Sequence, residues 1–428
     1  MSFDPEVAAR GVLLLVLLRL ALRLWLGARQ IRHVARHAVR VPERFAGAVS
    51  AGEHERAAQY TQARERLALV DALAEAALFL VLTFGGALQW LAAQCAALAG
   101  TGMAGALLLA ASFAVLVTLV EIPLDWVRQF RIEQRFGFNR MGPGMFLADL
   151  ARSALLGAAL GLPLLWLVLV LMERAGPWWW VWAWVAWALF SVGLAAAWPR
   201  FIAPLFNRFT PLGEGELRGR IGALLERTGF RSDGVFTMDG SRRSTHGNAY
   251  FTGLGAGKRV VFFDTLLERL DAGEIEAVLA HELGHFRLRH IARGIALQLA
   301  LALAWLAALG WLGARPELFA ALGLEAPPAG ALRNAIALLL FALATPLPAF
   351  LLSPLRSALS RRQEFEADAF AAGHARAADL ASALVKLHRD NAGTLTPDPL
   401  HSAFYDSHPP ASIRVERLLA LVPRHAAS

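Results

Sequence analysis

Seven apolar stretches, each near the length that crosses a lipid bilayer, constrain the fold of this chain more than any other feature. They lie at residues 11–28, 72–98, 103–122, 150–172, 177–198, 291–314 and 333–353. About 20 apolar residues span the hydrocarbon as a helix, and only helices and closed barrels satisfy every backbone polar group inside lipid. We therefore predict a mainly α-helical, polytopic membrane protein with seven transmembrane helices. The composition, 56% hydrophobic and 18% charged, agrees with this prediction.

The first stretch is the weakest of the seven, because it contains Arg19 and Arg23. No small-residue cleavage site follows it, so we predict a retained helix and not a signal peptide that is removed. The alternative is an amphipathic helix that lies on the membrane surface.

Arginine residues are concentrated in two of the loops between these stretches. The loop at 29–69 and the loop after the third stretch contain Arg29, Arg32, Arg36, Arg40, Arg44, Arg56, Arg64, Arg66, Arg128, Arg131, Arg135 and Arg140. Cytoplasmic loops carry an excess of Lys and Arg, so we predict that both loops and the C-terminus are cytoplasmic. The net charge of +8 follows from this asymmetry. It favours contact with anionic membrane lipids and gives no indication of nucleic-acid binding.

Two polar segments interrupt the apolar pattern and divide the chain into four parts. We predict five transmembrane helices with Arg-rich cytoplasmic loops at 1–199, a small α+β segment at 200–290, two transmembrane helices at 291–353, and C-terminal cytoplasmic helices at 354–428. Each polar segment follows an odd-numbered apolar stretch. Both segments therefore lie on one face of the membrane, which the arginine distribution makes the cytoplasmic face.

The segment at 200–290 contains both strand and helix signals. Short β-type runs at 235–238, 248–252 and 259–263, separated by turn residues, predict a small antiparallel sheet. The run Asp-Ala-Gly-Glu at 271–274 has the spacing of a capping box, which marks the start of a helix. We expect this helix to run without a break into the sixth apolar stretch.

The HExxH arrangement His281-Glu282-Leu283-Gly284-His285 lies on this predicted helix. Side chains four residues apart share one face of a helix. The two imidazoles can therefore bind one zinc ion while Glu282 reaches a water molecule on it. The alternative is that the two histidines lie on the protein surface and bind no metal, in which case the HExxH pattern would have arisen by chance. We predict a membrane-embedded zinc hydrolase.

A catalytic zinc site usually has three protein ligands, so HExxH alone is incomplete. Glu364 and Asp368 stand four residues apart on a predicted helix and match the ExxxD pattern of thermolysin-like zinc enzymes. We predict that Glu364 is the third ligand and that Asp368 accepts a hydrogen bond from a ligand histidine. Two apolar stretches, an even number, separate His285 from Glu364, so the chain returns to the same face. Glu366 or another histidine is the alternative third ligand.

These residues predict a zinc metalloendopeptidase that uses one zinc ion per chain and a zinc-activated water. Glu282 would take the proton of this water and later deliver it to the leaving amine. The second catalytic candidate is His408, in Ser407-His408-Pro409-Pro410, which would stabilise the oxyanion. The two prolines hold it just before a helix that includes Arg414.

Taken together, these motifs resemble the type 1 CAAX prenyl proteases, a family of integral membrane zinc metallopeptidases. The similar stretches follow one another in order between about residues 120 and 420, at 136–139, 201–207, 209–212, 240–244, 248–251, 263–267, 281–285, 364–368 and 408–410. The resemblance implies seven helices that enclose a water-filled intramembrane chamber, with the zinc site facing its interior.

The resemblance also implies substrate-binding residues. Asn248 and Ala249 match the edge strand along which the C-terminal region of a substrate lies, bound by main-chain hydrogen bonds. The position of His408 contacts the reacting carbonyl in that family, and Arg414 matches a motif arginine nearby. The implied partners are membrane lipids and a peptide or protein substrate, either C-terminal or lipid-modified.

The composition also predicts where the protein is located. Because it is rich in Arg and poor in Lys, it favours a bacterial inner membrane, with the active site facing the cytoplasm. No feature of the sequence indicates an oligomeric state.

Two alternative functions remain open. One alternative is a heat-shock-type membrane quality-control zinc protease, which shares HExxH. The other is a seven-helix transporter or channel, in which Asp71, Glu75 and Glu121 would line a path.

Overall fold

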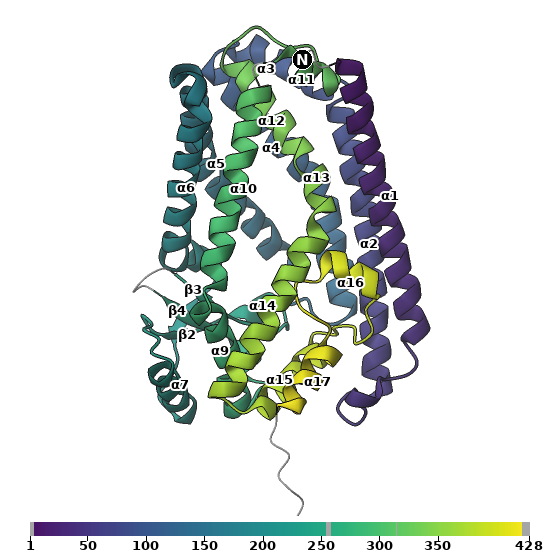
Figure 1. Cartoon of the computed structure of the whole chain (residues 1–428), viewed down its shortest axis with the longest axis vertical. Helices are drawn as coiled ribbons and strands as arrows, with labels where there is room; N and C mark the ends of the chain where they lie inside the picture. The colour runs from purple at the N-terminus through teal and green to yellow at the C-terminus, as the bar shows by residue number, and fades with distance from the viewer. Residues whose placement is uncertain (1–3, 254–257, 314, 422–428) are drawn as a thin grey trace, which may run out of the picture.

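Long helices, packed side by side along the longest axis of the molecule, make up most of the structure (Figure 1). The structure is a computed structural model that describes residues 4–253, 258–313 and 315–421. Small parts of the predicted ranges, namely residues 1–3, 254–257, 314 and 422–428, lie outside the described residues.

Six helical segments in the described chain are long and apolar enough to cross a membrane, or seven if one bent pair counts as a single span. They are built from α1 (Pro5–His37), α4 (Met103–Val127), α5 (Pro143–Arg174), α6 (Trp179–Ala197), α10 (His290–Leu312), and α12 (Ala331–Ala344) together with α13 (Pro346–Leu351). The prediction of a mainly helical, polytopic membrane protein is confirmed. The first apolar stretch is a long helix that packs along the bundle, as predicted (Figure 1).

The second apolar stretch is a bent pair and not one continuous helix. α2 (Ala51–Leu82) and α3 (Ala87–Ala99) meet at an angle of 56°. The hydroxyl of Thr83 donates to the carbonyl of Phe79 at 2.6 Å, and Gly86 adopts a left-handed backbone conformation that glycine tolerates best. The apolar stretch predicted at 72–98 is therefore broken near its middle, and it counts as a span only if the bent pair is taken together.

A four-stranded sheet lies at the end of the molecule opposite to α3 and α11 (Pro316–Ala321) (Figure 1). Its strands are β1 (Phe209–Pro211), β2 (Val235–Met238), β3 (Ala249–Thr252) and β4 (Arg259–Phe263), in the order β1-β2-β4-β3. The predicted antiparallel sheet was wrong for one pair, because β2 and β4 run parallel. After β2 the chain first forms β3 and then forms β4, which lies between β2 and β3 and is antiparallel to β3. This topology leaves β3 at the edge of the sheet.

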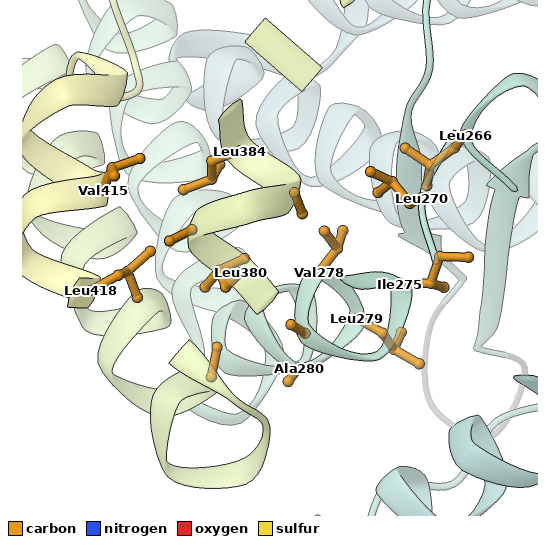
Figure 2. Packing of buried hydrophobic residues seen from close by; sticks show 14 of the residues in the cluster. Leu266, Leu270, Ile275, Val278, Leu279, Ala280, Leu380, Leu384, Val415 and Leu418 are labelled. Carbon is orange, nitrogen blue, oxygen red and sulfur yellow. The ribbon is translucent and has the colours of Figure 1, made fainter. Parts of the chain in front are cut away.

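Helices complete this end of the molecule, and most of them contribute buried side chains to its core. They are α7 (Glu216–Arg227), α8 (Asp264–Leu267), α9 (Ala272–Arg287), α14 (Ser353–His374), α15 (Ala377–Asp390), α16 (Pro399–Tyr405) and α17 (Ala411–Ala420). Buried side chains from α8, α9, α15 and α17 meet in one apolar cluster (Figure 2), including Leu266, Ile275, Val278, Leu380, Leu384, Val415 and Leu418. This cluster fixes the position of α9, which carries HExxH.

The helix that carries HExxH begins and ends at well-defined points. Its capping box is present: the Asp271 carboxylate accepts from the Glu274 backbone N–H at 2.9 Å, and Glu274 accepts from the Asp271 N–H at 3.0 Å. α9 ends at Arg287, and α10 starts at His290. Between them Arg289 has φ +60°, a left-handed conformation that costs a non-glycine residue roughly 1–2 kcal/mol. The prediction of one unbroken helix into the sixth span was therefore wrong.

Candidate metal centre

Three predicted ligands come together where α9 packs against α14. The Nε2 atoms of His281 and His285 lie 3.2 Å apart. Glu364 on α14 places Oε1 3.2 Å from His285 Nε2, and Oε2 3.5 Å from His281 Nε2. Glu364 and His281 are buried, with 3% and 6% of their surface exposed. One turn of α9 and a distant helix thus converge on one point.

The separations between these ligand atoms match a zinc site. Ligand atoms that lie about 2.0–2.1 Å from one zinc ion in tetrahedral geometry are about 3.3–3.4 Å from one another. The donor set of two imidazoles and one carboxylate is also a known catalytic zinc set. In addition, Glu364 Oε2 is a buried oxygen without a well-aligned hydrogen bond in the described chain, although Arg414 Nη1 forms an ion pair with it at 3.0 Å. These residues therefore fit the metal that the HExxH motif predicts.

Asp368, one turn after Glu364 on α14, lies behind His281. Its Oδ1 is 2.9 Å from His281 Nδ1. Arg414 on α17 donates two hydrogen bonds to Asp368, at 2.9 and 2.6 Å, and its Nη1 lies 3.0 Å from Glu364 Oε2. When the His281 ring is neutral, a hydrogen bond from its Nδ1–H to Asp368 leaves the Nε2 lone pair free to face the other two ligand atoms.

The charges of this cluster prepare it for a cation. Burial lowers the pKa of His281, but hydrogen bonds to Asp368 and Glu364 outweigh burial and raise this pKa to about 9. Burial raises the pKa of Glu364, but its close contacts with His281 and His285 outweigh burial and hold this pKa well below its ordinary value. The carboxylate is therefore ionised, and the site favours a positive charge.

A cavity of about 260 Å³ opens beside His281, the one candidate ligand among its lining residues. It is lined by other predicted site residues, namely Asn248, Ala249, Glu282, His408 and Arg414, and also by His388 and Asn391. Removal from water raises the pKa of Glu282 above its ordinary value, as expected for a carboxylate that must accept a proton. The structure thus gathers Glu282, the start of the edge strand and the candidate ligand His281 around one space.

His408 lines this cavity from the loop before α17. Its Nε2 is 3.4 Å from Glu364 Oε1, and its Nδ1 is 2.9 Å from the hydroxyl oxygen of Ser407. Partial removal from water lowers the pKa of His408, whose side chain is 64% exposed, and this shift favours the neutral ring. If the Ser407 hydroxyl donates to Nδ1, the proton of the ring is on Nε2 and can be donated into the cavity.

Two further cavities lie between the metal centre and the helical part of the molecule. One, of about 710 Å³, extends from His408 to Arg23, and the next, of about 440 Å³, extends from Arg23 to Glu121 among α1, α2, α4, α12 and α13. In the second cavity Glu75 accepts from Arg19 at 2.7 Å and also from Arg23. These charges of α1 and α2 therefore compensate each other inside the bundle.

The chain matches known proteins along nearly its whole length. Residues 30–208 match the family described as CAAX prenyl protease N-terminal, five membrane helices, and residues 211–422 match peptidase family M48. The rice CAAX prenyl protease 1 homolog is 32% identical over 422 residues, which cover 96% of each chain. The human CAAX prenyl protease 1 homolog is 33% identical and covers 80% of each chain. The chain belongs to the CAAX prenyl protease 1 family.

A solved member of the same family has the same fold. The crystal structure of Ste24p from S. mikatae superposes with a TM-score of 0.90, at 26% sequence identity, and covers 98% of this chain and 100% of that one. As a CAAX prenyl protease 1 family member, the chain is a multi-pass integral membrane metallopeptidase of family M48, as predicted. The rice and human relatives are eukaryotic proteins, so they do not support a bacterial inner membrane.

Three site features of this family member were not predicted from its sequence. Arg414, expected to contact substrate, is 5% exposed and lies mainly behind the ligands, paired with Asp368 and Glu364. Glu366, the alternative third ligand, instead lies 3.0 Å from His290. His290 in turn contacts His285. The only local signal for His290 was its place five residues after His285.

Arg414→Ala is expected to lower the stability of the metal-free protein by about 3–5 kcal/mol, because it leaves two buried carboxylates with fewer partners. The measurement is the free energy of unfolding in detergent, with metal removed from both proteins. Arg417→Ala is the matched control: this exposed arginine on α17 stacks on Phe365, and its loss should cost no more than about 1 kcal/mol. Equal losses in the two variants would contradict the structural role of the buried arginine.

Proposed function

We propose that this chain is a cytoplasm-facing membrane zinc endopeptidase that cleaves near the C-terminus of lipid-modified CAAX proteins. The observation that carries this proposal is a cavity lined by Glu282, His281 and the start of the edge strand β3, where His281 also belongs to the converging group His281, His285 and Glu364. The substrate class is supported by the names of the relatives, which are CAAX prenyl proteases.

His281, His285 and Glu364 would hold one zinc ion. When bound, zinc polarises the scissile carbonyl and makes its water a better nucleophile. Glu282, on the cavity wall and with a raised pKa, accepts the proton of the attacking water and delivers it to the leaving amine. His408 donates its Nε2–H to the oxygen on which negative charge develops. Asp368 keeps His281 in the correct tautomer.

The substrate would bind by strand addition to the free edge of β3. Because β3 pairs only with β4 in the described sheet, main-chain groups on its other side can pair with an extended peptide. Asn248 and Ala249 stand where this edge reaches the metal centre, since both line the cavity with Glu282. Main-chain pairing gives affinity without strong demands on side chains, and the lipid group would supply much of the selectivity.

The catalytic end of the molecule would face the cytoplasm. This orientation is supported by the Arg-rich loops that precede α2 and follow α4, on the same side as the sheet. We assign no bacterial membrane, since the relatives come from eukaryotes. Anionic lipid headgroups are the expected neighbours of these arginines.

The test of the proposed function is cleavage of a synthetic peptide that ends in CAAX, with and without a farnesyl group on its cysteine. The lipidated peptide is expected to lose its last three residues with a kcat/KM at least about tenfold higher, because the lipid buries many methylene and methyl groups. Mass spectrometry of the fragments measures the site, and Glu282→Ala protein is the control. Equal cleavage of both peptides, or degradation of an unfolded membrane protein instead, would favour the quality-control alternative.

A further inference from the structure

The second ligand histidine has a partner of its own behind it. His285 Nδ1, on the side of the ring away from the ligand cluster, lies 3.1 Å from His290 Nδ1. The opposite nitrogen of His290, Nε2, lies 3.0 Å from Glu366 Oε2. The other oxygen of Glu366 accepts from Arg362 Nε at 3.0 Å. His290 is only 4% exposed, so its ring is held between these two neighbours.

These contacts determine which nitrogen carries each proton. An ionised carboxylate can only accept, so His290 Nε2 must donate to Glu366. In a neutral imidazole the other nitrogen is then an acceptor, so His290 Nδ1 accepts from His285 Nδ1–H. His285 Nε2 is left with a lone pair, and this atom is the one that faces His281 and Glu364. The chain of contacts thus presents His285 in the tautomer that a metal ligand needs.

We propose that His290 and Glu366 form a positioning pair that fixes the orientation and tautomer of His285 for metal binding. The inference rests on the proposed zinc peptidase function and deepens it. His281 has a carboxylate in direct contact, Asp368, whereas His285 reaches its carboxylate, Glu366, through one intervening imidazole. Ligand histidines commonly donate their second N–H to a carboxylate or another acceptor, which orients the ring and raises its basicity.

The backbone explains how this arrangement is built. Three carboxylates of α14 serve this site: Glu364 belongs to the ligand cluster, Asp368 contacts His281, and Glu366 contacts His290, which in turn contacts His285. His290 can face back to His285 because α9 and α10 are separate helices, with Arg289 in the left-handed conformation between them. Such strained residues persist where the surrounding structure requires them. The break that contradicted the predicted continuous helix is thus the feature that places His290.

The test compares the zinc affinity of two variants at one position, by competition with a chelator in purified, folded protein. His290→Phe keeps the volume of the ring but has no acceptor for His285, and is expected to bind zinc about 10–100-fold more weakly. His290→Asn places a side-chain oxygen near the position of Nδ1, which can accept the same hydrogen bond. Its affinity is expected to stay within about fivefold of the unchanged protein.

A matched control removes a histidine outside this contact chain. His374 at the end of α14 bonds to the carbonyl of Phe370, and His374→Phe should leave the zinc affinity unchanged. Unchanged affinity in His290→Phe, or an equal loss in His290→Phe and His290→Asn, would overturn the proposal. An equal loss in both variants would mean that the packing of the ring, and not its hydrogen bond to His285, determines the zinc affinity.

If His290→Phe does not fold, the same question is answered at the more exposed Glu366. Glu366→Ala is expected to weaken zinc binding about tenfold, with Glu366→Gln between it and the unchanged protein, because the amide oxygen still accepts from His290. Equal affinities in all three proteins would overturn the positioning pair. Failure of the unchanged protein to bind zinc would instead contradict the proposed function itself.

Discussion

Glu282→Ala is expected to lower turnover by about 10²–10⁴-fold while zinc stays bound. Glu282 lines the cavity next to the candidate ligands but does not belong to the group whose ligand atoms converge. Its loss removes the base that accepts the proton of the attacking water and leaves the three ligands in place. The measurements are kcat on a CAAX peptide and the zinc content of the same preparation.

The control for this variant is Glu268→Ala, the same chemical change at an exposed position that follows α8. It should retain both activity and zinc. Turnover in Glu282→Ala close to that of the control would show that another group accepts the proton. Loss of zinc in Glu282→Ala would instead indicate that this carboxylate helps to hold the metal.

Glu364→Ala is expected to remove both the metal and the activity. The Glu364 oxygens lie 3.2 and 3.5 Å from the two imidazole nitrogens, so this residue closes the ligand cluster from the α14 side. Loss of a ligand should weaken zinc binding by more than the roughly 10–100-fold that is typical of residues behind the ligands. Zinc affinity by chelator competition and kcat measure the two effects. Zinc affinity equal to that of Glu282→Ala would remove Glu364 from the ligand set.

Local patterns in the sequence predicted the elements of this fold better than their connections. Apolar length identified the spans, and the capping box at Asp271 marked the start of α9. The parallel pairing of β2 with β4 could not be predicted, because it depends on how distant strands meet. The bend between α2 and α3 had a local signal, the run Phe84-Gly85-Gly86. The break at Arg289 had none, since arginine does not favour a left-handed conformation.

In the candidate site, too, the residues of local motifs could be predicted from the sequence, whereas the contacts between distant segments could not. His281 and His285 follow from helix geometry, and Glu364 follows from its motif and from an even number of membrane crossings between it and His285. The partners behind the ligands depend on tertiary packing. Arg414 reaches Asp368 because α17 packs close to α14, and His290 reaches His285 because the chain bends after α9. Neither the contact of Arg414 with Asp368 nor that of His290 with His285 could be predicted from the spacing of these residues in the sequence.

The zinc content of the unchanged protein, purified in parallel with the Glu282→Ala and Glu364→Ala variants, tests the central claim most directly. About one zinc ion per chain is predicted for the unchanged protein and for Glu282→Ala, and little or none for Glu364→Ala. An unchanged protein that contains no zinc and binds none when it is supplied, or the same zinc content in all three proteins, would contradict a metal centre built from His281, His285 and Glu364.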